Sequence, residues 1–307
     1  MIREHPFDRY SLIRLAEEQY DPSLVMIDSH RISSIPWPAD SASPMTLQLA
    51  ESVAANEKSA VSFLLAMTSI NYRFWYRATD GTLGRYSHLG KTGARALWAA
   101  FEAAWGPTIH TGSELAKRLH AEEFAVLFGN MPDRDGRLAI LGEILTHDKL
   151  SAATELLLAD IHAHRQVTVA QAAGLAAIFP LAFDDPYLKK AQLALSMIGA
   201  FLRTTGLDVG TEDLAAFADY QLPRVLRGLG VLAYSPSLAD RVDQQIPLAE
   251  NGHEERTIRA ATILACEAIA AHTGAEFCRA LTNQCRERLL VGRIVTGRIR
   301  GSVCRRC

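Results

Sequence analysis

Helical periodicity along most of the chain is the feature that most restricts its fold. Between residues 93 and 272, apolar side chains recur every three or four residues, as on the buried face of a helix. Alternating Val, Ile and Thr runs bounded by Asn-Gly or Asp-Gly, which indicate hairpin strands, are nearly absent. The expected helices span 93–104, 112–129, 136–147, 151–163, 168–178, 188–203, 211–218, 222–230, 235–243 and 254–272. The pattern predicts an all-α protein: a single globular multi-helix domain, with two lobes and a site between them as one arrangement of it.

The chain before residue 93 is less regular. A short helix is expected over 8–19, whereas 28–44, rich in proline and serine, is expected to form an irregular connection. The pattern over 45–69 is helical with a break near Asn56. Its second half is apolar almost all round, which predicts a buried helix.

Composition excludes several classes of protein. The chain has 307 residues, 49% of them hydrophobic and 21% charged, so it can bury a large core. The formal charge of −2, without a basic block, argues against wrapping of a nucleic-acid duplex and leaves a small anionic ligand open.

Sequence signals for cellular location point to the cytoplasm. The amino terminus lacks the apolar core of a signal or transit peptide. The most apolar window, Ile263–Ala271, is too short to span a membrane and carries Glu267. All five cysteines fall in the last fifth of the chain, an odd number without a framework spacing, as expected in a reduced compartment.

Asp219 is the polar group that most invites a functional interpretation. It lies between Phe217 and Tyr220, and Pro223 follows at a position that suits the first turn of a helix. At a helix start the dipole favours an ionised carboxylate, but an ionised carboxylate among apolar groups is costly unless it has partners. A helix cap is the commoner role for such an aspartate. This stretch alone therefore favours a cap, and a site only if other residues join it.

Four aromatic residues gather in the segment from Ile70 to Tyr76. They suit a hydrophobic core as well as a platform for a flat heterocycle, because aromatic rings bury a large area in either role. The next loop runs from Gly84 to Gly90-Lys91-Thr92 and resembles a phosphate-binding loop, but five residues separate its glycines where that motif has four. Since no parallel-sheet pattern surrounds it, binding of a nucleoside triphosphate is not expected.

Two lysines stand in the first turn of an expected helix. Asp184 and Asp185 form a turn before a helix that should start near Pro186, and Lys189 and Lys190 follow at once. The helix dipole disfavours cations at this end. Either an anionic ligand or a salt bridge to Asp185 would compensate them, and both remain open.

Other polar groups do not form a site. Near Asp160, His162 and His164 are two residues apart, so on a helix they point to different sides, and no second cluster joins them; a solvated surface is therefore expected. Cys304 and Cys307 end the chain in a basic tail that is expected to be disordered. No serine nucleophile elbow occurs. We therefore expect no metal site and no cofactor.

Several motifs follow one another in the order found in one known family. They are Ile70-Asn-Tyr-Arg-Phe-Trp75; Met131-Pro132 with Arg137; Phe183, Asp185 and Lys189-Lys-Ala-Gln192; Phe217-Ala-Asp-Tyr220 with Pro223, Leu229-Gly-Val and Tyr234-Ser; and Ile258-Arg-Ala260. Over roughly residues 23–272 the chain resembles the queuosine salvage proteins, the queuosine 5′-phosphate N-glycosidases. It departs from them in Lys190, usually arginine, in the stretch that keeps Tyr86 without a Gly-Tyr-Trp run, and in its cysteine-containing end.

The resemblance implies an all-helical fold akin to the helix-hairpin-helix DNA glycosylases. The expected parts are an N-terminal helix and connection packed on the core over 1–44, a catalytic domain over 45–300 and a disordered tail over 301–307. The implied reaction hydrolyses the base–ribose bond of queuosine 5′-monophosphate, or of a related 7-deazaguanine nucleotide, and releases queuine for salvage into tRNA modification. The expected partner is this small nucleotide, without a nucleic-acid duplex or a membrane. A non-catalytic nucleotide-binding or nucleobase-binding protein and a helical scaffold without a site are the alternatives.

The resemblance also assigns the catalytic roles. Cleavage of an N-glycosidic bond builds positive charge on the sugar, so an ionised carboxylate beside the anomeric carbon stabilises the transition state and orients water. Asp219 is the candidate for this carboxylate. Lys189 either binds the 5′-phosphate or pairs with Asp219 and holds it ionised.

The remaining candidates are expected to bind the substrate. Asp185 would accept hydrogen bonds from the amide edge of the base or from its cyclopentene amine. Phe74, Trp75 and Tyr220 would stack on the base, or else belong to the core. The other expected substrate-binding residues are Asn71, Tyr86, Lys190 and Arg224.

Overall fold

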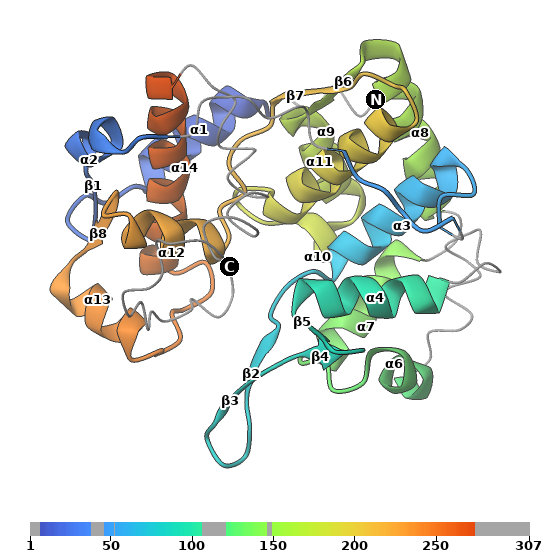
Figure 1. Ribbon diagram of the computed structural model, residues 1–307, viewed down its shortest axis with the longest axis horizontal. Helices are drawn as coiled ribbons and strands as arrows, with labels where there is room; N and C mark the ends of the chain where they lie inside the picture. Colours follow the sequence, from blue (N-terminus) through green and yellow to red (C-terminus); the bar gives the residue numbers. More distant parts are fainter. Residues whose placement is uncertain (1–6, 38–45, 52, 106–120, 146–148, 274–307) are drawn as a thin grey trace. The chain divides into compact units, whose positions relative to one another are not determined.

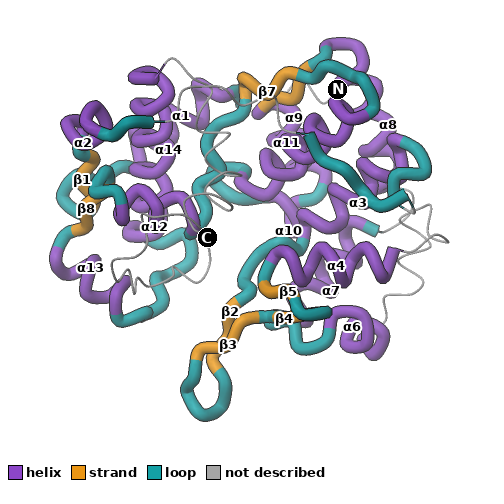
Figure 2. Tube along the Cα trace, in the orientation of Figure 1, coloured by secondary structure: helices purple, strands orange, loops and turns teal. Residues whose placement is uncertain are grey.

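The computed structural model describes residues 7–37, 46–51, 53–105, 121–145 and 149–273. Helices dominate this part of the chain (Figure 1; Figure 2). Of the described residues, 59% are helical and 10% are in strands, and the strands form only two-stranded sheets, which confirms the all-α prediction. None of the described helices is long and apolar enough to cross a membrane.

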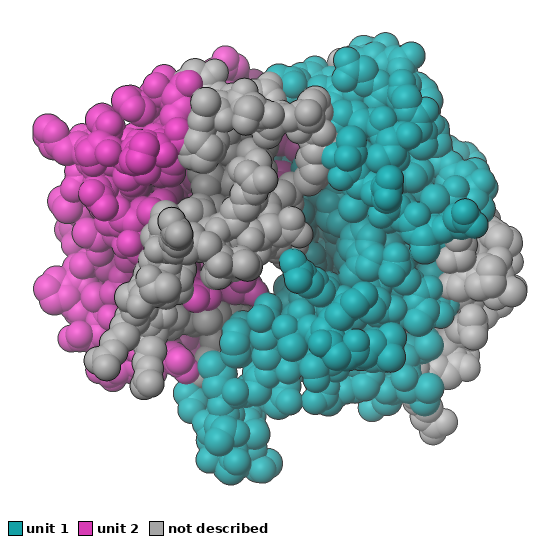
Figure 3. All heavy atoms as spheres, viewed as in Figure 1, with its two compact units in different colours: residues 1–6, 46–213 teal, residues 7–45, 214–307 magenta. Residues whose placement is uncertain are grey.

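The chain forms two compact units, coloured separately in Figure 3. The first unit contains the described residues from 46 to 213, and the second contains those from 7 to 37 and from 214 to 273. The expected tail over 301–307 lies outside the described residues, and the expected boundary between residues 44 and 45 stays a prediction.

The helices of the first unit are α3 (Glu57–Ser69), α4 (Ala94–Trp105), α6 (Ala121–Phe128), α7 (Arg134–Ile144), α8 (Lys149–His164), α9 (Val169–Ile178), α10 (Pro180–Phe183) and α11 (Lys189–Thr204). α3 contacts four of them, α4, α7, α8 and α11. Every residue of α3 from Ser59 to Ser69 is buried, as its continuous apolar pattern predicts. The helix begins after Asn56, whose side chain accepts a hydrogen bond from the Ser59 N–H at 2.8 Å.

Short strands complete the first unit. β2 (Trp75–Arg77) pairs with β3 (Leu83–Arg85), β4 (Ser87–His88) pairs with β5 (Lys91–Thr92), both antiparallel, and β6 (Gln166–Thr168) pairs in parallel with β7 (Gly210–Asp213). The segment that resembles a phosphate loop is therefore part of two hairpins. Leu89 and Gly90 form the turn between β4 and β5 with φ of 48° and 71°, the left-handed conformation that two-residue hairpin turns require.

The second unit joins the beginning of the chain to its later helices. Its elements are α1 (Arg9–Gln19), β1 (Val25–Ile27), α2 (Ser29–Ser34), α12 (Gln221–Gly228), β8 (Leu232–Tyr234), α13 (Pro236–Asp243) and α14 (His253–Thr273). α1 lies against α14, and β1 pairs antiparallel with β8 (Figure 1). An ion pair between Arg9 and Glu267 connects the two packed helices.

Three sequence-based expectations are wrong. Residues 211–218 are not a helix: the backbone from Gly210 pairs with β6, and the Asp213 carboxylate accepts the Val169 N–H at 2.9 Å, so this stretch is fixed by partners from a distant segment. The connection over 28–44 contains α2, because Asp28 caps a helix start by accepting the Arg31 N–H at 2.9 Å. Of the helical pattern expected over 45–69, the described residues before Asn56, which are 46–51 and 53–55, are not helical. The part of 112–129 before residue 121 lies outside the described residues.

Candidate active site

Residues 214–219 carry the predicted catalytic carboxylate in a buried segment without regular secondary structure. Every residue from Leu214 to Asp219 is at most 7% exposed, because five apolar side chains precede the carboxylate. Two tight turns shape the end of the segment: the Ala218 N–H donates to the Ala216 carbonyl at 2.9 Å, and the Asp219 N–H donates to the Phe217 carbonyl at 2.7 Å. The segment thus places a carboxylate in an apolar environment.

Asp219 lies two residues before the first residue of α12, as its sequence context predicts. Its Oδ1 accepts the N–H of Gln221, which opens the helix, at 2.7 Å. Pro223 is the third helical residue, within the first turn, where its missing N–H removes no bond of the helix. The carboxylate therefore satisfies a helix-start donor and lies near the positive end of the dipole. A capping contact and burial occur together at this residue.

The other two predicted residues of this unit follow the carboxylate in sequence. Tyr220, the residue before α12, and Arg224, in its first turn, are both half-buried. Arg227, one turn further on, is engaged elsewhere: its guanidinium forms two hydrogen bonds with the Asp243 carboxylate at 2.8 and 2.9 Å.

Arg259 of α14 is a buried cation next to the Asp219 segment, and sequence reasoning gave it no role. Its Nε donates to the Ala218 carbonyl at 3.1 Å. Sequence reasoning included it only as the middle residue of a matched motif. The signal that was present is an arginine in an otherwise apolar stretch of helix, a placement that is rare unless the charge has partners.

In the first unit, Asp185 and Lys189 meet at the start of α11. The Asp185 Oδ2 accepts the backbone N–H of Lys189, the first helical residue, at 2.5 Å. The helix begins at Lys189, one residue after the start of the expected span 188–203, and follows Leu188 in the left-handed conformation with φ of 53°. Asp185 is a helix cap by geometry, and Lys189 is a cationic residue in the first position of the helix, where the dipole is positive.

Lys190 connects the start of α11 to the end of α3. Its Nζ donates to the Ser69 carbonyl at 2.9 Å and lies 5.0 Å from the centroid of the Tyr72 ring. Burial, and after it the charge of neighbouring Lys189, lower the pKa of Lys190 to about 8, while Asp185 opposes the shift. The amine is therefore still mostly protonated at neutral pH.

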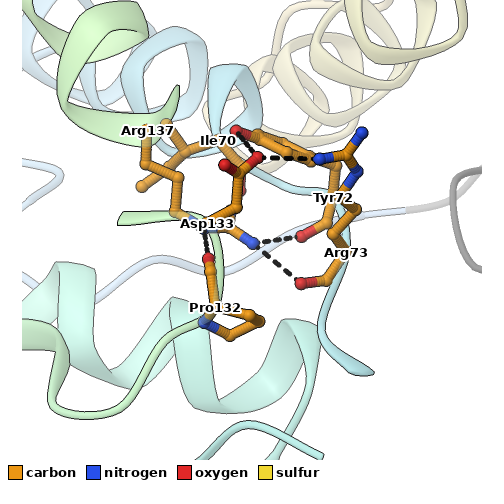
Figure 4. Close-up of polar contacts among 6 residues, drawn as sticks. All are labelled: Ile70, Tyr72, Arg73, Pro132, Asp133 and Arg137. Atoms are coloured by element: carbon orange, nitrogen blue, oxygen red, sulfur yellow. Dashed lines mark hydrogen bonds and ion pairs between the residues drawn. The ribbon is translucent and has the colours of Figure 1, made fainter. Parts of the chain in front are cut away.

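A buried arginine holds the aromatic segment that follows α3 (Figure 4). Arg137 is a residue of α7 and is fully buried. Its guanidinium donates hydrogen bonds to four backbone carbonyls. Its acceptors are the carbonyls of Pro132 at 2.8 Å, Arg73 at 3.0 Å, Ile70 and Tyr72. Burial lowers the pKa of Arg137 to about 10, so the side chain stays charged at neutral pH.

Asp133 makes a second set of contacts with the same segment (Figure 4). The Asp133 Oδ2 accepts the Tyr72 hydroxyl at 3.0 Å and pairs with the Arg73 Nη1 at 3.1 Å. Arg73 and Asp133 have φ of 40° and 57°, which side-chain-bearing residues rarely adopt. Such backbone conformations persist where surrounding contacts hold them, and they are concentrated at functional sites.

The predicted substrate-binding residues of this segment differ in accessibility. Asn71 and Phe74 are 6% and 4% exposed, and the Tyr86 ring is fully buried. Phe74 and Tyr86 stack on each other with centroids 6.3 Å apart, and burial raises the pKa of Tyr86 to about 12. Trp75 is half-buried in β2, with the Arg85 guanidinium 5.1 Å from its ring centroid.

The first unit thus holds Asn71, Phe74, Trp75, Tyr86, Asp185, Lys189 and Lys190, and the second holds Asp219, Tyr220 and Arg224. Among the residues that the structure describes, no group of three or more His, Cys, Asp or Glu side chains could hold a metal ion. His162 faces Glu57 at 2.7 Å and His164 faces Asp160 at 3.0 Å, so the two histidines point to different carboxylates.

Two comparisons bear on this set of residues. A family model described as queuosine salvage protein matches residues 186–290, a stretch that contains Lys189, Asp219 and Arg259. A queuosine 5′-phosphate N-glycosylase/hydrolase of Sphaerobacter thermophilus is 31% identical over 236 residues, which cover 67% of this chain and 67% of that protein.

Proposed function

The chain belongs to the queuosine salvage protein family, and from this premise we propose that it is an N-glycosidase acting on a 7-deazaguanine nucleotide. The substrate is queuosine 5′-monophosphate or a close relative. Water cleaves the bond between the base and C1′ of the ribose, the hydroxyl goes to C1′, and the proton goes to the base, which leaves as queuine for salvage into tRNA modification. The observation that supports this most directly is the buried carboxylate of Asp219 at a helix start, within the stretch that the family model matches.

Asp219 has the chemical character that the reaction requires. The sugar becomes oxocarbenium-like as the bond breaks, and an anion in surroundings of low polarity stabilises that charge far more than one in water. One carboxylate oxygen is held by the Gln221 N–H at 2.7 Å, so the group is oriented before substrate arrives. A 7-deazapurine has no N7 for a general acid to protonate, and electrostatic stabilisation therefore carries much of the rate enhancement.

We assign the 5′-phosphate to Lys189. A cation at the first position of the 16-residue helix α11 has no benefit from the dipole, whereas a phosphate at that end would interact with both the dipole and the ammonium. Asp185 already accepts the Lys189 N–H, so a role in base recognition would use its remaining lone pairs.

We assign base stacking to the aromatic residues whose side chains are partly exposed. Trp75 and Tyr220 are half-buried and therefore better suited to stack on a base than Phe74 and Tyr86, which stack on each other. We assign to Asn71, Lys190 and Arg224 supporting contacts with the substrate.

The decisive experiment is the release of queuine from queuosine 5′-monophosphate by the purified protein. Wild type should release the base, and Asp219→Asn should lower kcat by at least about 100-fold, because the amide keeps the oxygen that Gln221 binds but lacks the charge. Asp240→Asn, an exposed carboxylate of α13, should behave as wild type.

The capping contact of Asp219 also suits a non-catalytic nucleotide-binding or nucleobase-binding protein, because a cap needs no chemistry. For that alternative, wild type would bind the nucleotide without turnover, and Asp219→Asn would bind it equally well. Absence of release by a folded wild-type protein would rule out the proposed activity on this substrate.

A further inference from the structure

Two buried charges on α14 lie beside the segment that carries Asp219. Arg259 and Glu255, four residues apart on the helix, are 6% and 3% exposed, and their nearest charged atoms are 3.9 Å apart. The Arg259 Nε donates to the Ala218 carbonyl at 3.1 Å. Glu255 in turn accepts the backbone N–H of Asn251 at 2.6 Å. A continuous set of contacts thus leads from the start of α14 to the residue before Asp219.

A buried ion pair of this kind contributes little net stability to a core. Burial of two charges removes their hydration, and apolar residues of similar size are often as stabilising or more so. The pair does supply what apolar residues lack, a donor for the carbonyl of an irregular buried segment. Its position therefore indicates a role in geometry more than in stability.

We propose that Arg259 is a positioning residue of the active site, with Glu255 as its partner. The inference rests on the proposed function, and concerns where Asp219 is held. The Ala218 carbonyl and the Asp219 N–H belong to one planar peptide unit. Arg259 fixes one edge of this plane, and the bond from the Asp219 N–H to the Phe217 carbonyl, at 2.7 Å, fixes the other.

Asp219 is then held both at its backbone and at its carboxylate. The peptide plane sets the position of the Asp219 α carbon, and the Gln221 N–H holds its Oδ1 at 2.7 Å. Displacement of a catalytic group by about 1 Å lowers a rate by about 100-fold, so a backbone anchor next to the carboxylate acts on kcat more than on substrate affinity.

Lysine would not replace this arginine. The planar guanidinium directs Nε to the Ala218 carbonyl while Nη1 faces Glu255, two fixed directions on one side chain. A lysine keeps the charge but has a single nitrogen on a flexible stem. Arg259→Lys therefore separates placement from charge.

The test compares Arg259→Lys with Arg241→Lys, a matched arginine of the same unit that pairs with the side chain of Glu254. For Arg259→Lys we expect kcat for queuosine 5′-monophosphate to fall 10- to 100-fold, with KM within about twofold of wild type. Amide hydrogen exchange should accelerate in residues 214–221. Glu255→Gln should lower kcat and accelerate exchange over 214–221 by smaller amounts. Arg241→Lys should change neither kcat nor this exchange.

The outcomes distinguish this inference from the proposed function. If wild type releases queuine and folded Arg259→Lys keeps its kcat, the positioning role is wrong. Equal acceleration of exchange throughout the unit, with kcat lost only in proportion to unfolded protein, would show a purely structural residue and also overturn it. If wild type itself releases no base, the proposed function fails, and unchanged exchange over 214–221 in Arg259→Lys would independently show that the anchor does not exist.

Discussion

Asp219 and Lys189 both lie at helix starts, but their charges are opposite, so the helix dipole favours the charge of Asp219 and disfavours that of Lys189. Asp219 loses most of its hydration, but the Gln221 N–H and the positive end of α12 both favour its anionic form. Lys189 has the opposite charge at the same kind of helix end. The first arrangement favours an anion at Asp219 itself, whereas the second favours an anionic ligand next to Lys189, which is the phosphate in our proposal. We therefore expect variants of the two residues to affect different kinetic constants.

Lys189→Ala tests the assignment of the 5′-phosphate. A hydrogen bond to a charged group contributes about 1.5–3 kcal/mol, so KM for queuosine 5′-monophosphate should rise about 10- to 100-fold. KM for the nucleoside queuosine should stay within about threefold, because it lacks the phosphate. Lys149→Ala is the matched control, since Lys149 is also the first residue of a helix in the same unit. Steady-state kinetics on both substrates measures the difference, and an equal rise in KM for nucleoside and nucleotide would contradict the assignment.

Local sequence indicated the residues whose partners are close in sequence and missed those whose partners are distant. Asp219 and Asp185 were placed correctly next to helix starts, because a cap bonds to backbone two to four residues away. Arg137 and Arg259 bind carbonyls of segments 41 to 67 positions away, which no spacing rule reports. Their identity in matched motifs was visible, but their function as backbone anchors was not.

At the scale of elements, helices were predictable to within a few residues where one face of a helix is apolar. α11 was expected over 188–203 and spans Lys189–Thr204, and α14 was expected over 254–272 and spans His253–Thr273. The expected helix over 211–218 failed because Gly210–Asp213 pairs with β6, a contact made by tertiary structure and not by local preference. The apolar pattern in residues 214–218 reflects burial of an irregular segment, which the same pattern cannot distinguish from a short helix.

Arg137 is the contact on which the arrangement of the segment after α3 most depends. Its replacement by methionine would keep similar bulk and leave four carbonyls, previously bonded to one guanidinium, without this donor. Each buried acceptor that stays unpaired costs about 1–3 kcal/mol, so Arg137→Met should lower the free energy of unfolding by at least about 3 kcal/mol. Urea denaturation at pH 7 measures the change.

The matched control for that substitution is one turn earlier on the same helix. Arg134 is exposed at the start of α7, and Arg134→Met should change the free energy of unfolding by no more than about 0.5 kcal/mol. Similar changes in the free energy of unfolding for the two substitutions would mean that the four carbonyl contacts of Arg137 add no more stability than an exposed arginine does. A large effect of Arg137→Met alone supports the role of the four carbonyl contacts.

At the scale of the whole molecule, the unit that holds Asp219 is assembled from both ends of the described chain. α1 lies against α14, β1 pairs with β8, and the Thr257 hydroxyl donates to the Gln19 carbonyl at 3.2 Å. These contacts join residues more than 200 positions apart, so the early part of the chain supports the helix that anchors Ala218. Periodicity predicted both helices, but only the folded chain shows that they are neighbours.

Leu12→Ala tests whether this support reaches the candidate active site around Asp219. Leu12 is fully buried on α1, and loss of its side chain should lower the free energy of unfolding by about 2–5 kcal/mol. Because α1 packs on α14 and Arg259 of α14 holds the Ala218 carbonyl, amide hydrogen exchange should accelerate in α14 and in residues 214–221 as well as in α1. Tyr10→Ala, 76% exposed on the same helix, should leave stability and exchange nearly unchanged. If Leu12→Ala accelerates exchange in α1 alone, the first helix is an appendage, and the geometry of Asp219 does not depend on it.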